Sequence, residues 1–484
     1  MANDESGTSA GDGERIRAMD AVFLDAEEPG PSVAIGSVIV ADGPAPTLQE
    51  TRDFVASRIA LTPRLQQRIV PSSLRIRRPV WEHAEADLTH HVREIDLGGD
   101  GGDEALEQAV SRIMEVPLDF DRPLWDMHLL TGLADGFGMV TRVHHVVADG
   151  QGSVLMLGHL LDTDAAGTTT LTDALLGAGR ELAPSVGTGG SPRDHLVASV
   201  ADGGDRLMRA LRTSLHPGEA ATAVVDAGRR AGEQFASAAE AVRTWTAPRF
   251  GSLIGGSPGV RRHWHMVRMP IADVKAVKNA FGCTLNDVVM AMVSGGYGLM
   301  MQRRAKPTDG KYLKVVIPVS VRAPFDVSSN NQVSGLLTQL PVSGTAVERL
   351  TWITDHINKV KHSGEAESVK VITDMFNVAP AAIQTVAVRH RGPLPEWMVD
   401  TLVTNVPGPP FPTYYQGRRV RQMLPIVALG RPLWCLVAVL SFDGELSFGI
   451  STGEGGEQAG RDIREGIRQT LAELQATSGE GRVG

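Results

Sequence analysis

A change of composition near the middle of the chain constrains its fold most strongly. Between about residues 183 and 258 the sequence is rich in Ala, Gly, Ser, Thr and Arg, whereas regular apolar patterns run on both sides of this stretch. The chain has 484 residues, more than one compact core normally holds. We therefore expect an N-terminal domain over 1–182, a helical crossover over 183–258 and a C-terminal domain over 259–484.

Both flanking regions mix strand and helix patterns, which indicates an α/β fold. In the first region the expected elements are strands at 36–40 and 137–145, a helix opened by the capping box TLQE at 47–50, an amphipathic helix around 106–113 and a buried helix at 153–161. In the second region they are a helix at 271–281 ended by Gly282, a helix capped by Thr284, a strand at 313–321, a hairpin of 436–442 and 445–450 around Asp443-Gly444, and a closing helix at 461–474.

Charge and cysteine content exclude several classes of function. The formal net charge of −9 argues against a nucleic-acid partner, because neutralising phosphates requires clustered Lys and Arg. Local basic groups such as Arg303-Arg304 and Arg418-Arg419 could still contact a phosphorylated ligand or an anionic lipid surface. The chain has two cysteines, which form neither a disulfide framework nor a zinc cluster. We expect no metal, no cofactor and a reducing cytoplasm.

Membrane-spanning and secreted classes are also disfavoured. The longest apolar stretches, at 288–301 and 433–442, fall short of the roughly 20 residues that a membrane-spanning helix needs. Residues 1–13 are polar and acidic and lack the pattern of a secretory signal. If the protein meets a membrane or a lipid droplet, we expect it to lie on the surface.

The run TRVHHVVADG at 141–150 carries the strongest chemical signal. Two adjacent histidines at the end of a strand point to opposite faces, so only one of them can enter a shared active site. An imidazole suits the removal of a hydroxyl proton near neutral pH. Gly150 permits a backbone turn that a Cβ would hinder, and Asp149 would shape this turn or pair with a distant cation.

Two other patterns are weaker. His90-His91 is also a histidine pair, but the position that corresponds to Asp149 is Ile95, so we interpret this pair as structural. Residues 255–259 fit G-x-S-x-G, the nucleophile elbow of serine hydrolases. Pro258 follows the serine and has no N–H to donate to an oxyanion, which argues against that class.

Residues 144–150, HHVVADG, match the HHxxxDG signature of the bacterial wax ester synthase/diacylglycerol acyltransferase family. The shorter HxxxDG is shared with condensation domains and plant alcohol acyltransferases. Further segments resemble family motifs in family order: MDAVFL at 19–24 with Glu27 after it, DRPLW at 121–125, TLNDVVMA at 284–291, PVSVR at 318–322 and TNVPGP at 404–409. Met290 stands where the family often has Leu, and the segment at 441–444 often carries Tyr in the family.

The resemblance implies two chloramphenicol-acetyltransferase-like domains, of the CoA-dependent acyltransferase type, with an active-site tunnel between them. The expected reaction is transfer of a long-chain acyl group from acyl-CoA to diacylglycerol or to a long-chain alcohol. His145 would be the general base, with His144, Asp149 and Gly150 completing the catalytic motif. No acyl-enzyme is required.

The resemblance also suggests roles for residues outside this motif. Asn286 would stabilise the oxyanion, unless it is only a polar residue of the first helical turn. Asp287 would lie at the substrate or anchor its helix. Trp125 and Pro123 would line the acyl channel, or Trp125 would belong to the core. Glu27 is assigned to substrate binding by resemblance alone.

The last of these roles is an ion pair that would hold the motif loop. Arg322 would pair with Asp149 across the domain boundary, although a solvated strand end would account for an Arg there equally well.

Two other functions stay open. One is a carrier-protein-dependent condensation or polyketide-type acyltransferase, and the other is a non-catalytic lipid-binding relative that keeps the fold. Acyl length, the preferred acceptor and the oligomeric state are not encoded in any pattern that we can interpret.

Overall fold

The computed structural model describes residues 14–27, 32–71, 78–148, 150–175, 253–320, 333–362, 399–430 and 433–480. The chain divides into two compact units. One comprises Met1–Leu175 together with Arg249–Gly484, and every described residue belongs to it. The other, Leu176–Pro248, lies outside the described residues, and so does most of the expected crossover.

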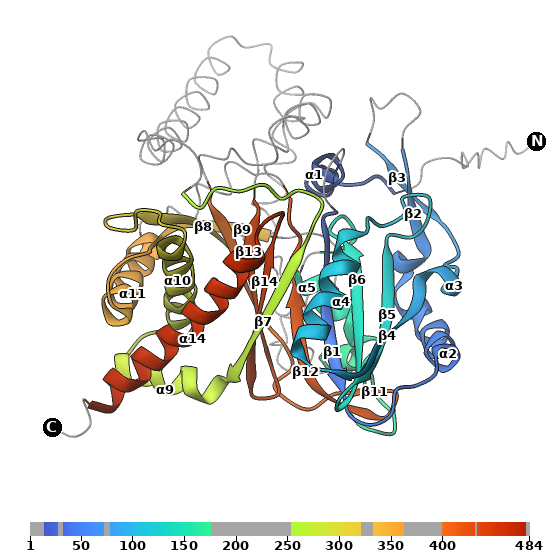
Figure 1. The fold of residues 1–484 in the computed structure, drawn as a ribbon. Coiled ribbons are helices and arrows are strands. Elements are labelled where there is room, and N and C mark those ends of the chain that lie inside the picture. Colours follow the sequence, from blue (N-terminus) through green and yellow to red (C-terminus); the bar gives the residue numbers. More distant parts are fainter. Residues whose placement is uncertain are drawn as a thin grey trace, which may run out of the picture. The chain divides into compact units, whose positions relative to one another are not determined.

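A six-stranded mixed sheet, the first sheet, is built mainly from the N-terminal part of the chain (Figure 1). Its strand order is β11-β12-β1-β6-β5-β4. The strands are β1 Ala34–Ala41, β4 Val92–Gly101, β5 Trp125–Leu133, β6 Gly136–His144, β11 Tyr414–Tyr415 and β12 Arg418–Ile426. β4 pairs with β5 in parallel, and the other neighbours pair antiparallel.

Helices lie on both faces of the first sheet. On one face is α4, Asp103–Glu115, whose Leu106, Val110 and Ile113 are buried as the amphipathic pattern predicted. On the other face, α2 (Leu48–Arg58) and α5 (Gly150–Gly158) line a pocket together with strand residues. Shorter elements of this half are α1 Ala18–Glu27, α3 Leu88–His91, the 3-10 helices Ile59–Leu61 and Pro63–Gln66, and the hairpin of β2 Gln67–Val70 and β3 Val80–His83.

A second six-stranded sheet has the order β7-β14-β13-β10-β8-β9. Its strands are β7 His263–Pro270, β8 Tyr312–Ser320, β9 Val333–Pro341, β10 Thr401–Pro407, β13 Cys435–Phe442 and β14 Glu445–Thr452. Its helices are α9 Ile271–Phe281, α10 Leu285–Arg303, α11 Ala346–His362 and α14 Glu457–Glu480. α10 is buried nearly along its whole length, and a Cβ on its Gly296 would lie 2.8 Å from the carbonyl oxygen of Ile463 on α14. These two helices therefore pack backbone against backbone.

One segment crosses from the second half of the sequence into the first sheet. β11 and β12 lie within the expected C-terminal domain at 259–484, yet β12 pairs with β1 along its length. At the junction Nε1 of Trp264 on β7 donates to the carbonyl of Pro425 on β12 at 3.2 Å. The expected boundary thus divides the sequence, but it does not divide the two sheets.

Locally determined elements agree closely with the sequence. Thr47 and Thr284 both form capping boxes, and Gly282 ends α9 in the left-handed region with φ of 63°. In the hairpin of β13 and β14, Asp443 and Gly444 have φ of 39° and 85°, the positive values that a two-residue type I′ turn requires. These predictions are confirmed.

Two helices differ from their expected bounds. α5 begins at Gly150 and ends at Gly158, whereas the pattern predicted 153–161. The prediction placed the start too late because Gly150 and Gly152 have low helix propensity, so the sequence of the first turn does not indicate a helix. α14 extends beyond 461–474 at both ends. Among the described residues no helix is both long and apolar enough to span a bilayer.

Candidate active site

The end of strand β6 positions both histidines of the motif. The backbone N–H of His144 donates to the carbonyl of Leu124 at 3.0 Å, directly before β5. The N–H of His145 donates to the carbonyl of Val33 at 3.3 Å, directly before β1. Val147 then closes a turn onto the carbonyl of His144 at 2.9 Å. The backbone at this point is therefore anchored to the strands on both sides.

His144 is fully buried, and both of its ring nitrogens are occupied. Its Nε2 lies 2.6 Å from Oε2 of Glu27, the last residue of α1. The backbone N–H of Val146 donates to its Nδ1 at 3.0 Å, so Nδ1 carries no proton and the Nε2–H donates to the carboxylate. His144 is thus held as one neutral tautomer that offers no nitrogen to a substrate.

His145 has a different environment. Its ring stacks on Phe23 of α1, with ring centroids 3.9 Å apart and an interplanar angle of 9°. Its side chain is half-buried, whereas His144 has no exposed surface. Of the two histidines, His145 is therefore the one that a solvent-borne substrate can approach.

Three other residues of the predicted site bear on the loop after β6. Gly150 is the first residue of α5, so this helix begins at the last residue of the motif. Asp149 and Arg322 lie outside the described residues, and their expected ion pair stays a prediction.

Asn286 and Asp287 lie in the first turn of α10. The Asp287 carboxylate accepts a hydrogen bond from the backbone N–H of Thr284 at 2.9 Å. The backbone N–H of Asp287 donates to the Thr284 hydroxyl at 3.2 Å, which completes a capping box. At 2% exposure Asp287 anchors the helix start. Nδ2 of Asn405 on β10 lies 3.4 Å from Oδ1 of Asn286. This contact assigns the Asn286 oxygen as the acceptor and leaves its amide N–H groups for other partners.

Trp125 and Pro123 are both buried beside the first sheet. The Trp125 indole N–H donates to the carbonyl of Leu65 at 2.9 Å, and its ring stacks on His91 with centroids 4.5 Å apart. His91 Nδ1 lies 2.7 Å from the Trp125 carbonyl, and burial lowers the pKa of this imidazole. His91 is therefore packed into the core, consistent with our interpretation of that histidine pair as structural.

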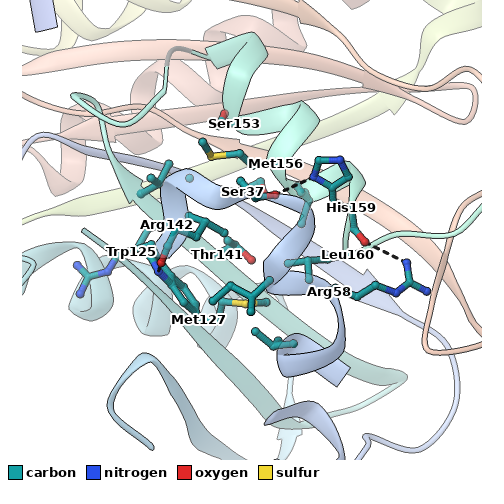
Figure 2. A pocket seen from close by; sticks show the side chains of 17 residues that line it. Ser37, Arg58, Trp125, Met127, Thr141, Arg142, Ser153, Met156, His159 and Leu160 are labelled. Carbon is teal, nitrogen blue, oxygen red and sulfur yellow. Dashed lines mark hydrogen bonds between the residues drawn. The ribbon is translucent and has the colours of Figure 1, made fainter. Parts of the chain in front are cut away.

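Trp125 also lines a pocket between the first sheet and helices α2 and α5 (Figure 2). Thr141, Arg142 and Val143 of β6 belong to its wall. Because side chains alternate along a strand, those of Thr141 and Val143 point to the face opposite those of Arg142 and His144. The lining is mainly apolar, from Val55, Ile59, Leu65, Trp125, Met127, Val143, Met156, Leu157 and Leu160. At one side His159 Nδ1 lies 2.8 Å from the Thr62 hydroxyl, so polar groups there are already paired.

A buried ion pair holds the opposite face of β6. Nε and Nη2 of Arg142 donate to the two carboxylate oxygens of Asp126 at 2.6 and 2.7 Å. Nη1 of Arg142 donates to the carbonyls of Ile113 and Val116 at the end of α4. Arg142 therefore ties α4 to the strand that carries the histidines.

The two basic pairs identified in the sequence make contacts within the protein. Arg303 binds Asp462 at 2.8 Å and Glu465 at 2.7 Å, and Arg419 binds Asp443 at 2.9 Å. Nε of Arg418 donates to the carbonyl of Pro44 at 2.8 Å. The charges of Arg303 and Arg419 are thus partly neutralised by carboxylates, which makes these pairs weaker candidates for a phosphate contact than the sequence indicated.

Phe23 is a site residue that sequence reasoning did not assign. It belongs to the segment at 19–24 that resembles a family motif, but nothing in the pattern connected it with His145. Glu27 lies four residues later, and this i, i+4 spacing on a helix was the available signal that both contact one neighbour. Across the described ranges, no group of three or more His, Cys, Asp or Glu side chains is arranged to hold a metal ion.

Comparisons with known proteins identify the family of the chain. The wax ester synthase/diacylglycerol acyltransferase catalytic domain matches residues 16–289, and the WS/DGAT C-terminal domain matches 329–475. A Mycobacterium tuberculosis protein named a probable diacylglycerol O-acyltransferase is 30% identical over 475 residues, covering 97% of each chain.

Solved structures share the fold. The wax ester synthase/diacylglycerol acyltransferase from Marinobacter aquaeolei VT8 superposes with a TM-score of 0.67 at 22% identity, covering 96% of this chain and 100% of that one. The first condensation domain of the calcium-dependent antibiotic synthetase superposes with a TM-score of 0.59 at 18% identity, covering 97% of each chain. The chain is an acyltransferase that belongs to the wax ester synthase/diacylglycerol acyltransferase family.

Proposed function

We propose that the protein transfers a long-chain acyl group from acyl-CoA to diacylglycerol or to a long-chain alcohol, with His145 as the general base. The observation that carries this proposal is the contrast between the two histidines. His144 uses both ring nitrogens inside the protein, whereas His145 is half-buried at the end of β6. A general base must reach the hydroxyl proton that it removes.

The reaction needs no covalent enzyme intermediate. His145 takes the proton of the acceptor hydroxyl while the hydroxyl oxygen attacks the thioester carbonyl. The tetrahedral intermediate then expels the CoA thiolate as the C–S bond breaks, and the imidazolium returns the proton to sulfur. The products are the ester and free CoA, and His145 regains its initial state.

Asn286 is the proposed donor to the oxyanion. The Asn405 amide near its Oδ1 supports an orientation in which the Asn286 N–H groups face other acceptors. A preorganised donor of this kind commonly contributes about 3 kcal/mol to transition-state stabilisation. Its position in the first turn of the buried helix α10 supplies the rigidity that such a donor needs.

The pocket at Trp125 is the proposed site of the acyl chain. Its apolar lining suits a hydrocarbon, and its wall includes Thr141 and Val143 of β6, which lie four and two residues before His145. Because side chains alternate along a strand, this wall belongs to the strand face opposite His144. The tunnel expected between the two halves remains a prediction.

Both lipid substrates favour association with a lipid surface, and we propose that the protein binds peripherally to membranes or lipid droplets. Flotation with vesicles that contain dipalmitoylglycerol tests this. Protein that stays at the bottom of the gradient at low salt would count against it.

The deciding measurement is release of CoA thiol from palmitoyl-CoA, with dipalmitoylglycerol and hexadecanol as parallel acceptors and the lipid products identified. We expect acceptor-dependent thiol release, and a loss of about 10²-fold or more in His145→Ala. His90→Ala is the matched control, because His90 belongs to the structural histidine pair. Thiol release unchanged in His145→Ala would overturn the mechanism.

The same assay separates the alternatives. Folded protein that is inactive with acyl-CoA but active with an acyl carrier protein donor would identify a condensation-type enzyme. Inactivity with both donors, together with lipid binding, would identify a non-catalytic relative.

A further inference from the structure

Helix α1 contacts both motif histidines through two residues on one face. Phe23 and Glu27 are four residues apart, so their side chains lie one above the other on the helix. Phe23 stacks on the ring of His145 at 3.9 Å between centroids. Glu27 accepts the Nε2–H of His144 at 2.6 Å. Two consecutive residues at the end of β6 are therefore each held by a residue of the same helical face.

The Glu27 carboxylate is connected to the His145 backbone as well. Its Oε2 accepts the N–H of Val33 at 3.2 Å in addition to the His144 proton. The carbonyl of the same Val33 accepts the N–H of His145 at 3.3 Å. One carboxylate oxygen thus fixes the His144 tautomer and also anchors the residue on which the His145 backbone rests.

Burial of the Glu27 carboxylate at this position lowers the stability of the folded protein unless its oxygens find partners. It is 7% exposed, and its Oε1 is buried without a hydrogen-bond partner in the described part of the chain. Burying a carboxylate costs free energy unless its oxygens are satisfied, and an apolar residue of similar size would avoid this cost. The nearby Arg262 offsets part of the burial electrostatically, although burial itself lowers the pKa of that guanidinium to about 10. A role beyond packing would explain why a half-satisfied carboxylate stands here.

We propose that α1 is a two-point clasp on the catalytic strand end, in which Glu27 is a positioning residue and Phe23 orients the His145 ring. This assignment replaces substrate binding as the role of Glu27, and it rests on the proposed function of His145 as the base. Glu27 acts through His144, whose locked tautomer and buried ring hold the turn at 144–147. Phe23 restricts rotation of the His145 imidazole by covering one of its faces.

The test uses the full-length chain with Glu27→Ala, Glu27→Gln and Phe23→Leu. Glu107→Gln is the matched control, because Glu107 is another buried carboxylate that contacts a histidine, His265, at 3.1 Å. For each variant we would measure kcat, KM for palmitoyl-CoA and the pH dependence of kcat/KM. Hydrogen–deuterium exchange of the peptide that covers 136–148 provides a readout that does not depend on turnover. Thermal unfolding confirms that each variant is folded.

For Glu27→Ala we expect kcat to fall by about 10²-fold with KM for palmitoyl-CoA nearly unchanged, because a base displaced by about 1 Å loses that much. The exchange of 136–148 should become faster as the Val146 N–H loses its fixed acceptor. Glu27→Gln keeps an acceptor for His144 and should recover most of kcat. Glu27→Gln removes a negative charge that favours protonation of the nearby imidazoles. The acid limb of the kcat/KM profile of this variant should therefore move to lower pH. Phe23→Leu should lower kcat several-fold with exchange at 136–148 close to that of the wild type.

The proposal is overturned if Glu27→Ala keeps wild-type kcat and wild-type exchange at 136–148, or if Glu107→Gln moves the acid limb of the pH profile as much as Glu27→Gln does. If Glu27→Ala does not fold, the pH profile of Glu27→Gln and the kcat of Phe23→Leu decide, and wild-type values for both reject the clasp. A wild-type protein that makes no ester would reject the proposed function instead, and the exchange of 136–148 would still report on the clasp.

Discussion

The carboxylate of Glu107 on α4 lies 3.1 Å from Nδ1 of His265 on β7, and this contact joins a helix of the first sheet to a strand of the second. The same carboxylate accepts the N–H of Met266 at 2.9 Å and is bound by Arg464 of α14 at 2.9 Å. Three residues from two elements of the second half of the chain, β7 and α14, therefore converge on one residue of the first half. This arrangement makes Glu107 a determinant of how firmly the two sheets are held together.

We expect Glu107→Ala to lower the free energy of unfolding by about 3 kcal/mol, because removal of one partner leaves buried polar groups of the others unpaired. Chemical denaturation at pH 7 measures the loss. Arg68→Ala, which removes an exposed ion pair with Glu82, should change stability by less than about 1 kcal/mol. If Glu107→Ala and Arg68→Ala lowered the free energy of unfolding equally, burial would not make the Glu107 contacts stronger than an exposed ion pair.

Stability should also depend on the protonation of Glu107. Burial raises the pKa of this carboxyl, but hydrogen bonds from His265 and Met266 and the charges of His265 and Arg464 outweigh burial and leave the pKa below its ordinary value of 4.5. A pKa lowered by folding adds stability that is present above about pH 4.5 and is lost as pH falls through the lower folded value. Denaturation midpoints of wild type and Glu107→Gln should therefore differ above pH 5 and converge toward pH 3.

We expect substitutions at Arg142 and Asp126 to have strongly non-additive effects on the free energy of unfolding. Burial raises the pKa of Asp126, yet hydrogen bonds from His128 and Arg142 and their charges bring it well below the ordinary value. Arg142→Leu should cost about 3–5 kcal/mol, because it leaves the Asp126 carboxylate buried without its guanidinium. The double variant Arg142→Leu/Asp126→Leu should be more stable than Arg142→Leu alone. A double variant that is less stable by the sum of the single losses would exclude the coupling.

Asn286→Ala should lower kcat by about 10²–10³-fold with little change in KM for palmitoyl-CoA, if its amide stabilises the oxyanion. Asn405→Ala should have a smaller effect in the same direction, because it removes only the contact that orients Asn286. Thr284→Ala serves as the control for loss of the helix cap, which costs about 1 kcal/mol of stability. A kcat in Asn286→Ala equal to that in Thr284→Ala would leave Asn286 with a capping-turn role only.

The pocket at Trp125 predicts a change in chain-length preference. Met156 on α5 lines it, so Met156→Trp should fill space and lower kcat/KM for palmitoyl-CoA more than for octanoyl-CoA. Leu133→Phe, at the far end of β5 and outside the pocket lining, should leave the ratio of the two unchanged. An unchanged ratio in folded Met156→Trp would place the acyl chain elsewhere.

Elements whose signals are local could be predicted from the sequence. The capping boxes at Thr47 and Thr284, the end of α9 at Gly282 and the turn at Asp443-Gly444 depend on residues within a few positions of one another. Their hydrogen bonds and backbone angles form in whatever tertiary context the segment has. The motif at 144–150 likewise identified the histidine pair, because its spacing is itself a sequence property.

The tertiary structure decided what the sequence alone could not. Glu27 and His144 are separated by 117 positions, and β12 pairs with β1 from the opposite half of the chain. No periodicity or spacing specifies such partners, because they are selected by packing of the complete fold and by the need to pair buried polar groups. By itself the sequence determined the local elements and the residues that carry the chemistry. Only the folded chain decided which histidine is fully buried and held on both ring nitrogens, which is half-buried, and that α1 contacts both.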